Sequence, residues 1–310
     1  MRLFNFSAGP SILPLPVLEQ AQRDLIALPG VGMSVLEISH RSKTFDAILQ
    51  TAEADMRALA GIPKDYRILF LQGGASLQFS MVPMNLLTPG TSADYVLTGE
   101  WSNKAIKEAG KLGSVRVAAT TEPGGFRRVP RRDEIALKAD AAYVHVTSNE
   151  TIHGVEWREI PDLGPAPVVC DASSDIFSGP IDVRKFGVIY AGAQKNLGPS
   201  GLTVVVIRED LLTRSAESLP SMLSFRVQAQ NDSMFNTPNV WAVYIFGLVM
   251  KWLHGLGGLA AIARINDRKA GLLYSELDRT GFWQPHADTD SRSRRSEEHT
   301  SELQSPYVIS

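Results

Sequence analysis

The sequence has little cysteine and little net charge, and both absences narrow the class of protein. Cys170 is the only cysteine among 310 residues, so the chain cannot form an internal disulfide. A single thiol fits a reducing compartment, and we expect a cytoplasmic protein. The chain carries 31 basic and 33 acidic residues, for a net charge of -2. No overall field attracts nucleic acid or an anionic membrane, so an anionic ligand must be bound by a local group of cations.

Long hydrophobic runs and several common catalytic motifs are also absent. The longest apolar run, VWAVYIFGLVMKWLHGLGGLAAI, reaches Lys251 and His254 before it could span the roughly 20 residues of a bilayer core. We expect a buried helix there, followed by a glycine-rich hinge, and no membrane partner. The start, MRLFNFSAGPSILPLP, has no continuous apolar stretch and does not resemble a signal peptide. The histidines lack HxxxH and HxH spacing, and GxSxG, P-loop and GxGxxG patterns are missing.

The sequence does contain a regular alternation of short β-branched runs with amphipathic stretches. The strand candidates are RILFLQ, DYVLTG, VRVAAT, AYVHV, PVVCDA, FGVIYA and LTVVVI. Helical periodicity is present at residues 17–27, 45–60, 76–87, 102–112 and 132–138. Such alternation is typical of an α/β fold with a mostly parallel sheet. The link GAQKNLGPSG between the last two strands is too short for a parallel crossover, so we expect that pair to be antiparallel and the seven-stranded sheet to be mixed.

Ligands of open α/β sheets bind beyond the carboxyl ends of the strands, so the residues that follow each strand are site candidates. Lys195 lies in a turn of small residues between two apolar runs. An amine in a partly desolvated turn has a lowered pKa and reacts with carbonyl groups, as a Schiff-base lysine must. Its alternative is a solvated surface lysine. Asp171 fits two roles equally well, a cap or turn residue and a carboxylate that keeps the ring nitrogen of pyridoxal phosphate (PLP) protonated.

Three further segments carry side chains suited to a phosphorylated aromatic cofactor. Gly73 and Gly74 precede a helical pattern, where free N–H groups, the helix dipole and the hydroxyl of Ser76 suit a phosphate. A simple strand-to-helix turn explains them too. Trp101 directly follows a strand and can either stack on a flat ring or belong to the core. Thr151 either donates to a phenolic oxygen or closes a loop.

The segment SHRSKTF forms a local group of cations, His40, Arg41 and Lys43. A solvated turn is the simplest explanation of such a group. Arg41 is nonetheless suited to bidentate recognition of a carboxylate or a phosphate. In a chain without net positive charge, we expect this segment to bind the anionic end of a substrate.

Eight segments fall in the order seen in phosphoserine aminotransferases, and the chain resembles that family from Leu3 to about Trp283. They are FNFSAGPSILP, HRSKTF, GGASLQF, TGEWSNKAIKEA, SNETIHGVE, CDASSDIFSGPIDV, GAQKNLGPSG and FNTPNVWAVYIFGLVMKWL. The resemblance implies a fold-type I PLP-dependent transferase with a large domain and a small C-terminal α/β domain. It also implies a homodimer with shared active sites.

The resemblance further implies a role for each candidate residue. Lys195 is expected to form the Schiff base with PLP, Asp171 to pair with the pyridine nitrogen, and Trp101 to stack on the ring. The other implied ligands are Ala75, Ser76 and Gln194 at the cofactor phosphate, Thr151 at the phenolic oxygen, Asn236 and Thr237 at the phosphate of the neighbouring subunit, and His40 and Arg41 at the substrate's phosphate or distal carboxylate.

The implied reaction is a reversible transamination in serine biosynthesis. Glutamate gives its amino group to 3-phosphohydroxypyruvate, and O-phosphoserine and 2-oxoglutarate are formed. Some relatives also make 4-phosphohydroxythreonine for vitamin B6 biosynthesis. Two alternatives stay open, namely another fold-type I enzyme (an alanine-glyoxylate type aminotransferase or a cysteine desulfurase) and an inactive truncated product. A desulfurase needs a nucleophilic cysteine on a mobile loop, whereas Cys170 lies within an apolar strand.

We divide the chain into four parts: an N-terminal segment (1–15), a large PLP-binding domain (16–255), an incomplete small C-terminal domain (256–289) and a polar tail (290–310). From about Gln284 the sequence is polar and lacks periodicity, and RSEEHTSELQS resembles the translation of a sequencing-library adapter. We therefore expect a non-native tail, a truncated small domain and little aminotransferase activity of the chain as written.

Overall fold

The structure, a computed structural model, describes residues 9–280 and 282–294. The adapter-like stretch and the first eight residues lie outside this part of the chain. The α-helices are α1 (Leu15–Ile26), α2 (Lys43–Ala60), α3 (Gly74–Leu86), α4 (Glu100–Gly110), α5 (Glu209–Leu212), α6 (Phe225–Gln230), α7 (Val240–Gly255) and α8 (Leu259–Thr280). The strands are β1 (Tyr66–Leu71), β2 (Ser92–Leu97), β3 (Ser114–Thr120), β4 (Val144–Thr147), β5 (Asn149–Glu150), β6 (Val155–Glu156), β7 (Val168–Asp171), β8 (Val188–Gly192) and β9 (Thr203–Arg208).

Seven of these strands form one mixed sheet, in the order β1-β9-β8-β7-β4-β2-β3, and β5 pairs with β6 separately. Strand β9 is antiparallel to both of its neighbours, whereas the other pairs in the large sheet are parallel. The seven predicted strands and the antiparallel pairing of the last two are therefore confirmed. The chain reverses before β9 at Gly201, whose φ of +94° is one that glycine adopts without strain.

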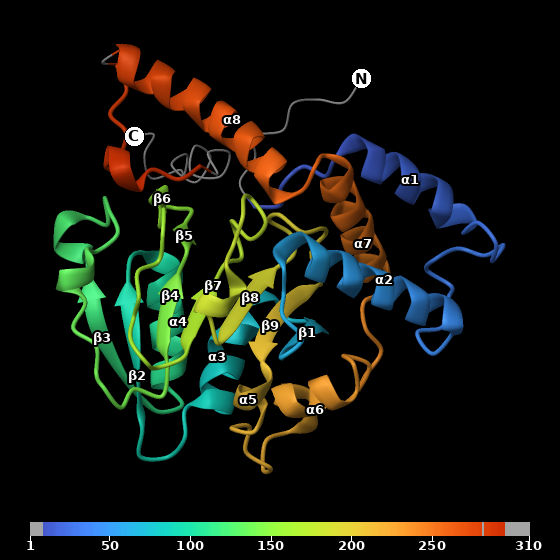
Figure 1. The fold of residues 1–310 in the computed structure, drawn as a ribbon, viewed down its shortest axis with the longest axis horizontal. Helices are drawn as coiled ribbons and strands as arrows, with labels where there is room; N and C mark the ends of the chain where they lie inside the picture. The colour runs from blue at the N-terminus through green and yellow to red at the C-terminus, as the bar shows by residue number, and fades with distance from the viewer. Residues whose placement is uncertain (1–8, 281, 295–310) are drawn as a thin grey trace, which may run out of the picture.

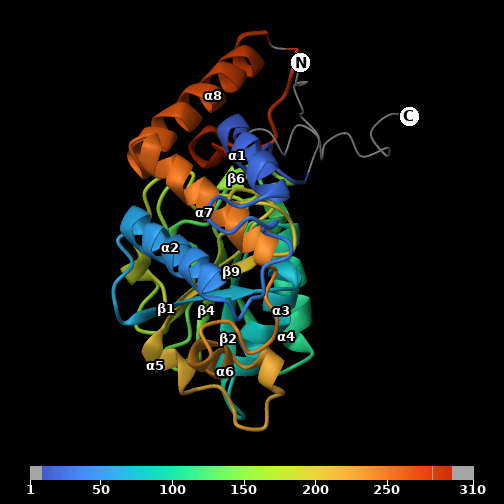
Figure 2. The same ribbon diagram turned by 90° about the vertical axis from the view of Figure 1, so that its right-hand side faces the viewer.

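Helices cover both faces of this sheet, as Figures 1 and 2 show. Helices α2 and α7 lie on one face, and α3 and α4 lie on the other. The side chains of β1 alternate accordingly: Ile68 and Phe70 belong to the core beneath α2 and α7, and Leu69 and Leu71 belong to the core beneath α3 and α4. Because both faces are covered, several strands read as continuous apolar runs in the sequence.

The longest apolar run forms helix α7, most of which is buried. Gly257 and Gly258, with φ of +96° and +77°, separate α7 from α8. The predicted buried helix and glycine-rich hinge are thus confirmed. In the part of the chain that the structure describes, no single helix is long and apolar enough to cross a membrane, and one pair, α7 with α8, reaches that length only with a bend of 86°.

The prediction of a helix at residues 132–138 is wrong. Only a single 3-10 turn, Arg132–Glu134, forms there. The following N–H groups bond to neighbouring elements, since Ala136 N–H donates to the carbonyl of Ala118 at 2.9 Å and Lys138 N–H donates to Asp94 Oδ2 at 2.7 Å. These tertiary hydrogen bonds replace the local ones that a helix needs.

The segment that follows α8 folds back beneath that helix, beside β6 (Figure 1). Ser293 N–H donates to the carbonyl of Gly154 at 2.8 Å. Arg294 forms an ion pair with the buried Glu156 in β6 at 2.7 Å. Of the expected polar tail, 290–310, the described residues up to Arg294 therefore lie against the two-stranded sheet that follows β4.

Candidate active site

The candidate site lies at the carboxyl edge of the sheet, where parallel strands deliver the residues that follow them to one place. Asp171 ends β7, and in the neighbouring strand β8 it pairs with Tyr190. Lys195 follows β8 in the turn toward β9. The first turns of α3 and α4 begin at the same edge, after β1 and β2, so four separate segments converge there.

Lys195, Trp101 and Thr151 form the centre of the site. The Nζ atom of Lys195 lies 5.2 Å from the centroid of the Trp101 ring. The indole Nε1 of Trp101 donates to Thr151 Oγ1 at 2.9 Å, and Thr151 is only 1% exposed. These contacts unite residues predicted from three motifs that are far apart in the sequence.

Asp171 provides a buried carboxylate beside this centre and is 4% exposed. Burial raises its pKa, while the N–H of Ser173, which donates to Oδ1 at 3.0 Å, and the nearby charge of Lys195 act in the opposite direction. Ser148 fixes the backbone of Asp171 by donating to its carbonyl from both N–H (2.9 Å) and Oγ (3.0 Å). A carboxylate at this depth favours a cationic partner such as a protonated ring nitrogen.

Helix α3 begins at two glycines, and its first N–H groups have no side-chain cap. Its N-cap is Gly73, which has φ +93° and makes no side-chain cap, and Gly74 has φ +66°. A Cβ on Gly73 would lie 2.5 Å from Cδ2 of Leu77, so a side chain cannot be accommodated there. Ala75 and Ser76 follow in the first turn, where Ser76 is exposed. The N–H groups of this turn and the hydroxyl of Ser76 can together bind a phosphate.

Two further candidate segments lie near this edge. Gln194 lies at the end of β8, and the loop of Asn236 and Thr237 lies beside the end of β1. A Cβ on Gly192 would be 2.9 Å from Oε1 of Gln194, so the Gln194 side chain folds back over the end of β8. The carbonyl of Thr237 accepts from Gln72 Nε2 at 3.0 Å, which holds this loop beside the end of β1. The side chain of Thr237 is exposed, and that of Asn236 is partly buried.

His40 and Arg41 precede α2, which begins because Ser42 Oγ accepts from the N–H of Phe45 at 3.2 Å. His40 is partly buried, and Arg41 is exposed. The backbone N–H of Arg41 donates to Ser39 Oγ at 3.2 Å. Within the described residues, no hydrogen bond or ion pair joins the side chain of Arg41 to the group around Lys195.

Two residues of the site were missed in the sequence. Glu150 is 1% exposed and accepts from the N–H of Trp101 at 3.0 Å. Lys104 lies one helical turn after Trp101 and places Nζ 4.2 Å from the centroid of its ring. Both residues lie within quoted segments, TGEWSNKAIKEA and SNETIHGVE, but nothing in their type or spacing assigned them a role, and only the position of Glu150 at a strand end, one residue before Thr151, could have indicated one.

A layer of buried aromatic and polar side chains lies on the same face of the sheet as Asp171. Nε2 of His145 and the hydroxyl of Tyr190 are 2.9 Å apart, and the His145 ring stacks on Tyr95 with centroids 4.7 Å apart. The hydroxyls of Tyr95 and Tyr143 are 2.7 Å apart. Burial lowers the pKa of His145 to about 3, so its ring is neutral.

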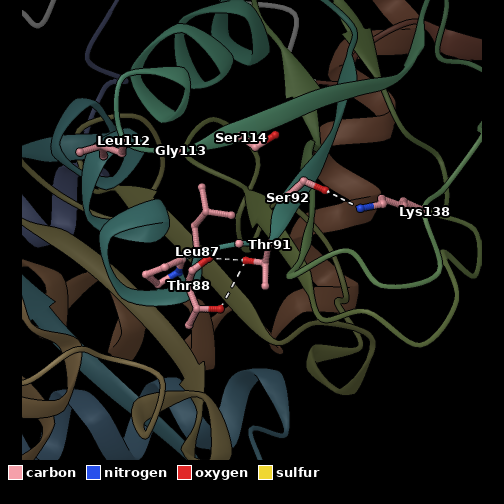
Figure 3. Close-up of a pocket in the computed structure, with 10 residues that line it drawn as sticks. Leu87, Thr88, Thr91, Ser92, Leu112, Gly113, Ser114 and Lys138 are labelled. Atoms are coloured by element: carbon pink, nitrogen blue, oxygen red, sulfur yellow. Dashed lines mark hydrogen bonds between the residues drawn. The ribbon is translucent and has the colours of Figure 1, made fainter.

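A separate pocket of about 490 Å³ lies at the opposite edge of the sheet, by the first residues of β2 and β3 (Figure 3). Four of its polar side chains, those of Thr88, Thr91, Ser92 and Lys138, already interact with one another or with neighbours. Thr91 Oγ1 donates to the carbonyl of Thr88 at 2.7 Å, and Lys138 Nζ lies 3.2 Å from Asp140 and 3.4 Å from Ser92 Oγ. The reactive groups of the carboxyl edge are not part of it.

The side chains at the carboxyl edge fit PLP. Lys195 has an amine that can react with an aldehyde, Trp101 has a flat ring, Asp171 has a buried carboxylate suited to a ring nitrogen, and the first turn of α3 has N–H groups suited to a phosphate. The buried carboxylate is the most specific of these features, because a carboxylate that is 4% exposed is stabilised by a cationic partner.

Comparison with known proteins agrees with this site. The family model for aminotransferase class-V matches residues 3–297. The phosphoserine aminotransferase of Geobacillus kaustophilus is 52% identical over 293 residues, which cover 94% of this chain and 81% of the relative. The solved phosphoserine aminotransferase from Bacillus circulans subsp. alkalophilus is 47% identical with a TM-score of 0.93 and covers 94% of this chain and 81% of its own. The PLP-bound enzyme from Trichomonas vaginalis is 39% identical with a TM-score of 0.90 and covers 94% and 82%.

These matches extend over nearly the whole chain, well beyond the segments that carry the candidate residues. They agree with the mixed seven-stranded sheet and with the fit of the carboxyl edge to PLP. The chain therefore belongs to the class-V aminotransferases and, within them, to the phosphoserine aminotransferase family, whose cofactor is pyridoxal phosphate.

Proposed function

We propose that the site of this chain serves the transfer of the amino group of glutamate to 3-phosphohydroxypyruvate, which forms O-phosphoserine and 2-oxoglutarate. Because little activity is expected of the chain as written, the activity assays below use a protein in which residues 288–310 are replaced by the corresponding segment of a relative. The observation that carries the proposal is the convergence of Lys195, Trp101 and Asp171 at one edge of the sheet. The 52% identity to a curated phosphoserine aminotransferase supports the same substrates. We also propose a cytoplasmic location, in line with the single, free Cys170.

The cofactor would be held by residues from five segments. PLP, when bound, supplies an electrophilic carbon and a conjugated ring that accepts an electron pair. The carboxylate of Asp171 keeps the ring nitrogen protonated, and burial strengthens this interaction because little water screens it. Trp101 covers the ring. The other proposed ligands are Thr151 at the phenolic oxygen and Ala75, Ser76 and Gln194 at the phosphate.

Lys195 has two tasks in this proposal. Its Nζ would hold the cofactor, and the same atom would take up and return the proton of the substrate's α-carbon. The aromatic ring of Trp101 beside Nζ excludes water from one side of the amine.

His40 and Arg41 are the proposed ligands of the substrate's anionic end. An arginine fork can bind a phosphate or a carboxylate, so both substrates can use one site in turn. We further propose a homodimer in which Asn236 and Thr237 reach the cofactor phosphate of the partner subunit. The exposed side chains of Phe235 and Thr237 are available for such a contact, and light scattering of the purified protein measures the oligomeric state directly.

The cysteine desulfurase alternative is disfavoured by the structure of Cys170. Its side chain is 1% exposed, and burial raises the pKa of the thiol well above its usual value. The nearby carboxylates of Asp171 and Asp175 act in the same direction. A nucleophilic thiolate is therefore not formed at this position near neutral pH.

The proposal is tested by reducing the PLP-loaded protein with borohydride and locating the pyridoxyl group by peptide mass spectrometry. We expect the label on Lys195, and we expect Lys195→Ala to lose both the label and transamination. Lys104→Ala is the matched control, because Lys104 lies over the same aromatic ring. This variant should still carry the label on Lys195. A label on Lys104 or on any other lysine would disprove the assignment.

The substrate assignment is tested with Arg41→Ala. A lost charge-assisted hydrogen bond costs about 1.5 to 3 kcal/mol, which corresponds to a rise of about 10- to 100-fold in the KM for phosphoserine. The affinity for PLP should stay the same. The control is Lys43→Ala, which removes a neighbouring cation from the first turn of α2. Equal KM values for Arg41→Ala and the wild type would show that Arg41 is not a ligand of the substrate.

A further inference from the structure

Helix α4, which carries Trp101 in its first turn, begins at an N-cap residue without a side chain, Gly99. The first N–H groups of a helix have no partner within the helix and need acceptors from elsewhere. Glu150, in β5, supplies them. Its Oε2 accepts from Trp101 N–H at 3.0 Å, and its Oε1 accepts from Ser102 N–H at 2.9 Å and from Ser102 Oγ at 2.7 Å.

Glu150 and the next residue hold Trp101 at two points. The carboxylate binds the backbone N–H of Trp101, and Thr151 Oγ1 binds its indole Nε1 at 2.9 Å. Both acceptor residues are 1% exposed, so water does not compete with them. The ring held in this way lies 5.2 Å from Nζ of Lys195. A displacement of the Glu150 carboxylate would therefore move the Trp101 ring relative to Lys195.

The carboxylate of Glu150 occupies the space that a side chain on residue 99 would need. A Cβ on Gly99 would lie 2.7 Å from Cδ of Glu150 and 2.8 Å from Nδ1 of His153. The φ of Gly99 is 166°, an extended conformation open to any residue, so packing and not backbone strain requires glycine here. The first turn of α4 can approach β5 this closely only because residue 99 has no side chain.

We propose that Glu150 is a positioning residue of the cofactor site, whose carboxylate fixes the first turn of α4 and thereby the orientation of the Trp101 ring. The inference rests on the proposed function, because it takes Trp101 as the residue that covers the cofactor ring. It assigns to Glu150 no contact with the cofactor. Its effect passes through α4 alone.

The charges around Glu150 support a role beyond packing. Burial raises the pKa of Glu150 to about 7, the charge of Asp171 acts in the same direction, and the hydrogen bonds from Ser102 and Trp101 oppose both. His153, which also contacts the space at Gly99, has its pKa lowered by burial. Glu100 lies in the same helical turn. An ionised carboxylate at this depth is unfavourable for the folded chain, so its benefit must come from what it holds in place.

The test is Glu150→Gln, measured as the dissociation constant of PLP from the apo-protein and as the visible circular dichroism of bound PLP. An amide has one acceptor oxygen. If the amide oxygen accepts from Ser102, the NH₂ group points at the N–H of Trp101. Both groups are donors, so the hydrogen bond to Trp101 is lost. We expect the dissociation constant to rise about tenfold, the effect of a lost helix cap, with a changed dichroism because the ring is reoriented.

The matched control is Glu156→Gln. Glu156 is equally buried and lies opposite Asn149 in the β5–β6 pair, but it binds Arg294 and not α4. This variant should leave PLP affinity and dichroism unchanged. Gly99→Ala is an independent second variant, because its Cβ displaces the Glu150 carboxylate without altering it, and it should act in the same direction as Glu150→Gln.

The possible results separate the two proposals. A wild type that carries PLP on Lys195, together with Glu150→Gln and Gly99→Ala variants of unchanged affinity and dichroism, would overturn the role of Glu150 and leave the proposed function intact. Equal losses of affinity in Glu150→Gln and Glu156→Gln would also overturn it, because general support of β5 and β6 would then explain the effect. A pyridoxyl label away from Lys195 would count against the proposed function itself.

Discussion

The ionisation of Glu150 should make the stability of the apo-protein depend on pH. Burial and the charge of Asp171 raise its pKa from 4.5 to about 7. The folded chain therefore binds this proton more tightly than the unfolded chain does. As the pH rises through this range, the unfolded chain releases the proton first, and the folded state loses stability relative to it. The loss is complete once the pH exceeds the folded pKa.

The size of the effect follows from the difference between the two pKa values. One pKa unit corresponds to about 1.4 kcal/mol, so a carboxyl raised from 4.5 to about 7 costs the folded apo-protein about 3 kcal/mol above about pH 8. Glu150 is buried, so solvent does not reduce this cost greatly. Glu150→Gln removes the titration. Relative to the wild type, the variant should gain about 3 kcal/mol of unfolding free energy between about pH 5 and about pH 8.

Urea denaturation of both apo-proteins, followed by circular dichroism at several pH values, measures this difference. The comparison between variant and wild type cancels the titrating groups that both proteins share and that do not interact with Glu150. If the difference in unfolding free energy stayed the same from about pH 5 to about pH 8, the buried ionisation of Glu150 would be refuted. A variant that is more stable at high pH and yet binds PLP more weakly would show that Glu150 serves the site at a cost in stability.

Two further predictions concern buried groups that are not proposed ligands of the cofactor. Asn85 in α3 donates to the carbonyl of Leu223 and accepts from Ser215 Oγ and Phe225 N–H. Asn85→Ala should therefore destabilise the protein by about 2 to 4 kcal/mol in urea denaturation. A loss below about 1 kcal/mol would contradict this. The buried Cys170 should not react with a thiol reagent in the native protein and should react in urea, whereas rapid labelling under native conditions would mean that β7 opens readily.

The large sheet could be predicted from the sequence because its signal is local. Each of the seven strands is a short run of β-branched and aromatic residues between turns, and covering helices make these runs apolar on both faces. The paired strands β5 and β6 were missed, because each has two residues and no periodicity can be detected over that length. The helix expected at residues 132–138 failed for the opposite reason. Its periodicity was present, but Asp94 and Ala118 take its backbone hydrogen bonds.

The reactive residues of the site could be predicted because topology places them. Lys195 and Asp171 follow adjacent parallel strands, and any such pair meets at the carboxyl edge. Residue type alone left each with a second explanation, a solvated lysine for Lys195 and a cap or turn residue for Asp171, so their roles stay predictions. The structure adds their burial, which determines the pKa of Asp171 and which no single segment of the sequence contains.

The orientation of Trp101 could not be predicted, because it depends on residues that have no local relation to one another. Gly99 reads in the sequence as an ordinary turn residue, and Glu150 reads as one polar residue in a polar loop. Only when α4 lies against β5 does the missing side chain of Gly99 leave room for the carboxylate that caps the helix. The strand ends thus determine which groups reach the site, whereas contacts between distant segments determine how those groups face one another. A sequence pattern can therefore point to candidate groups at this edge of the sheet, and the residues that orient them have to be found in the structure.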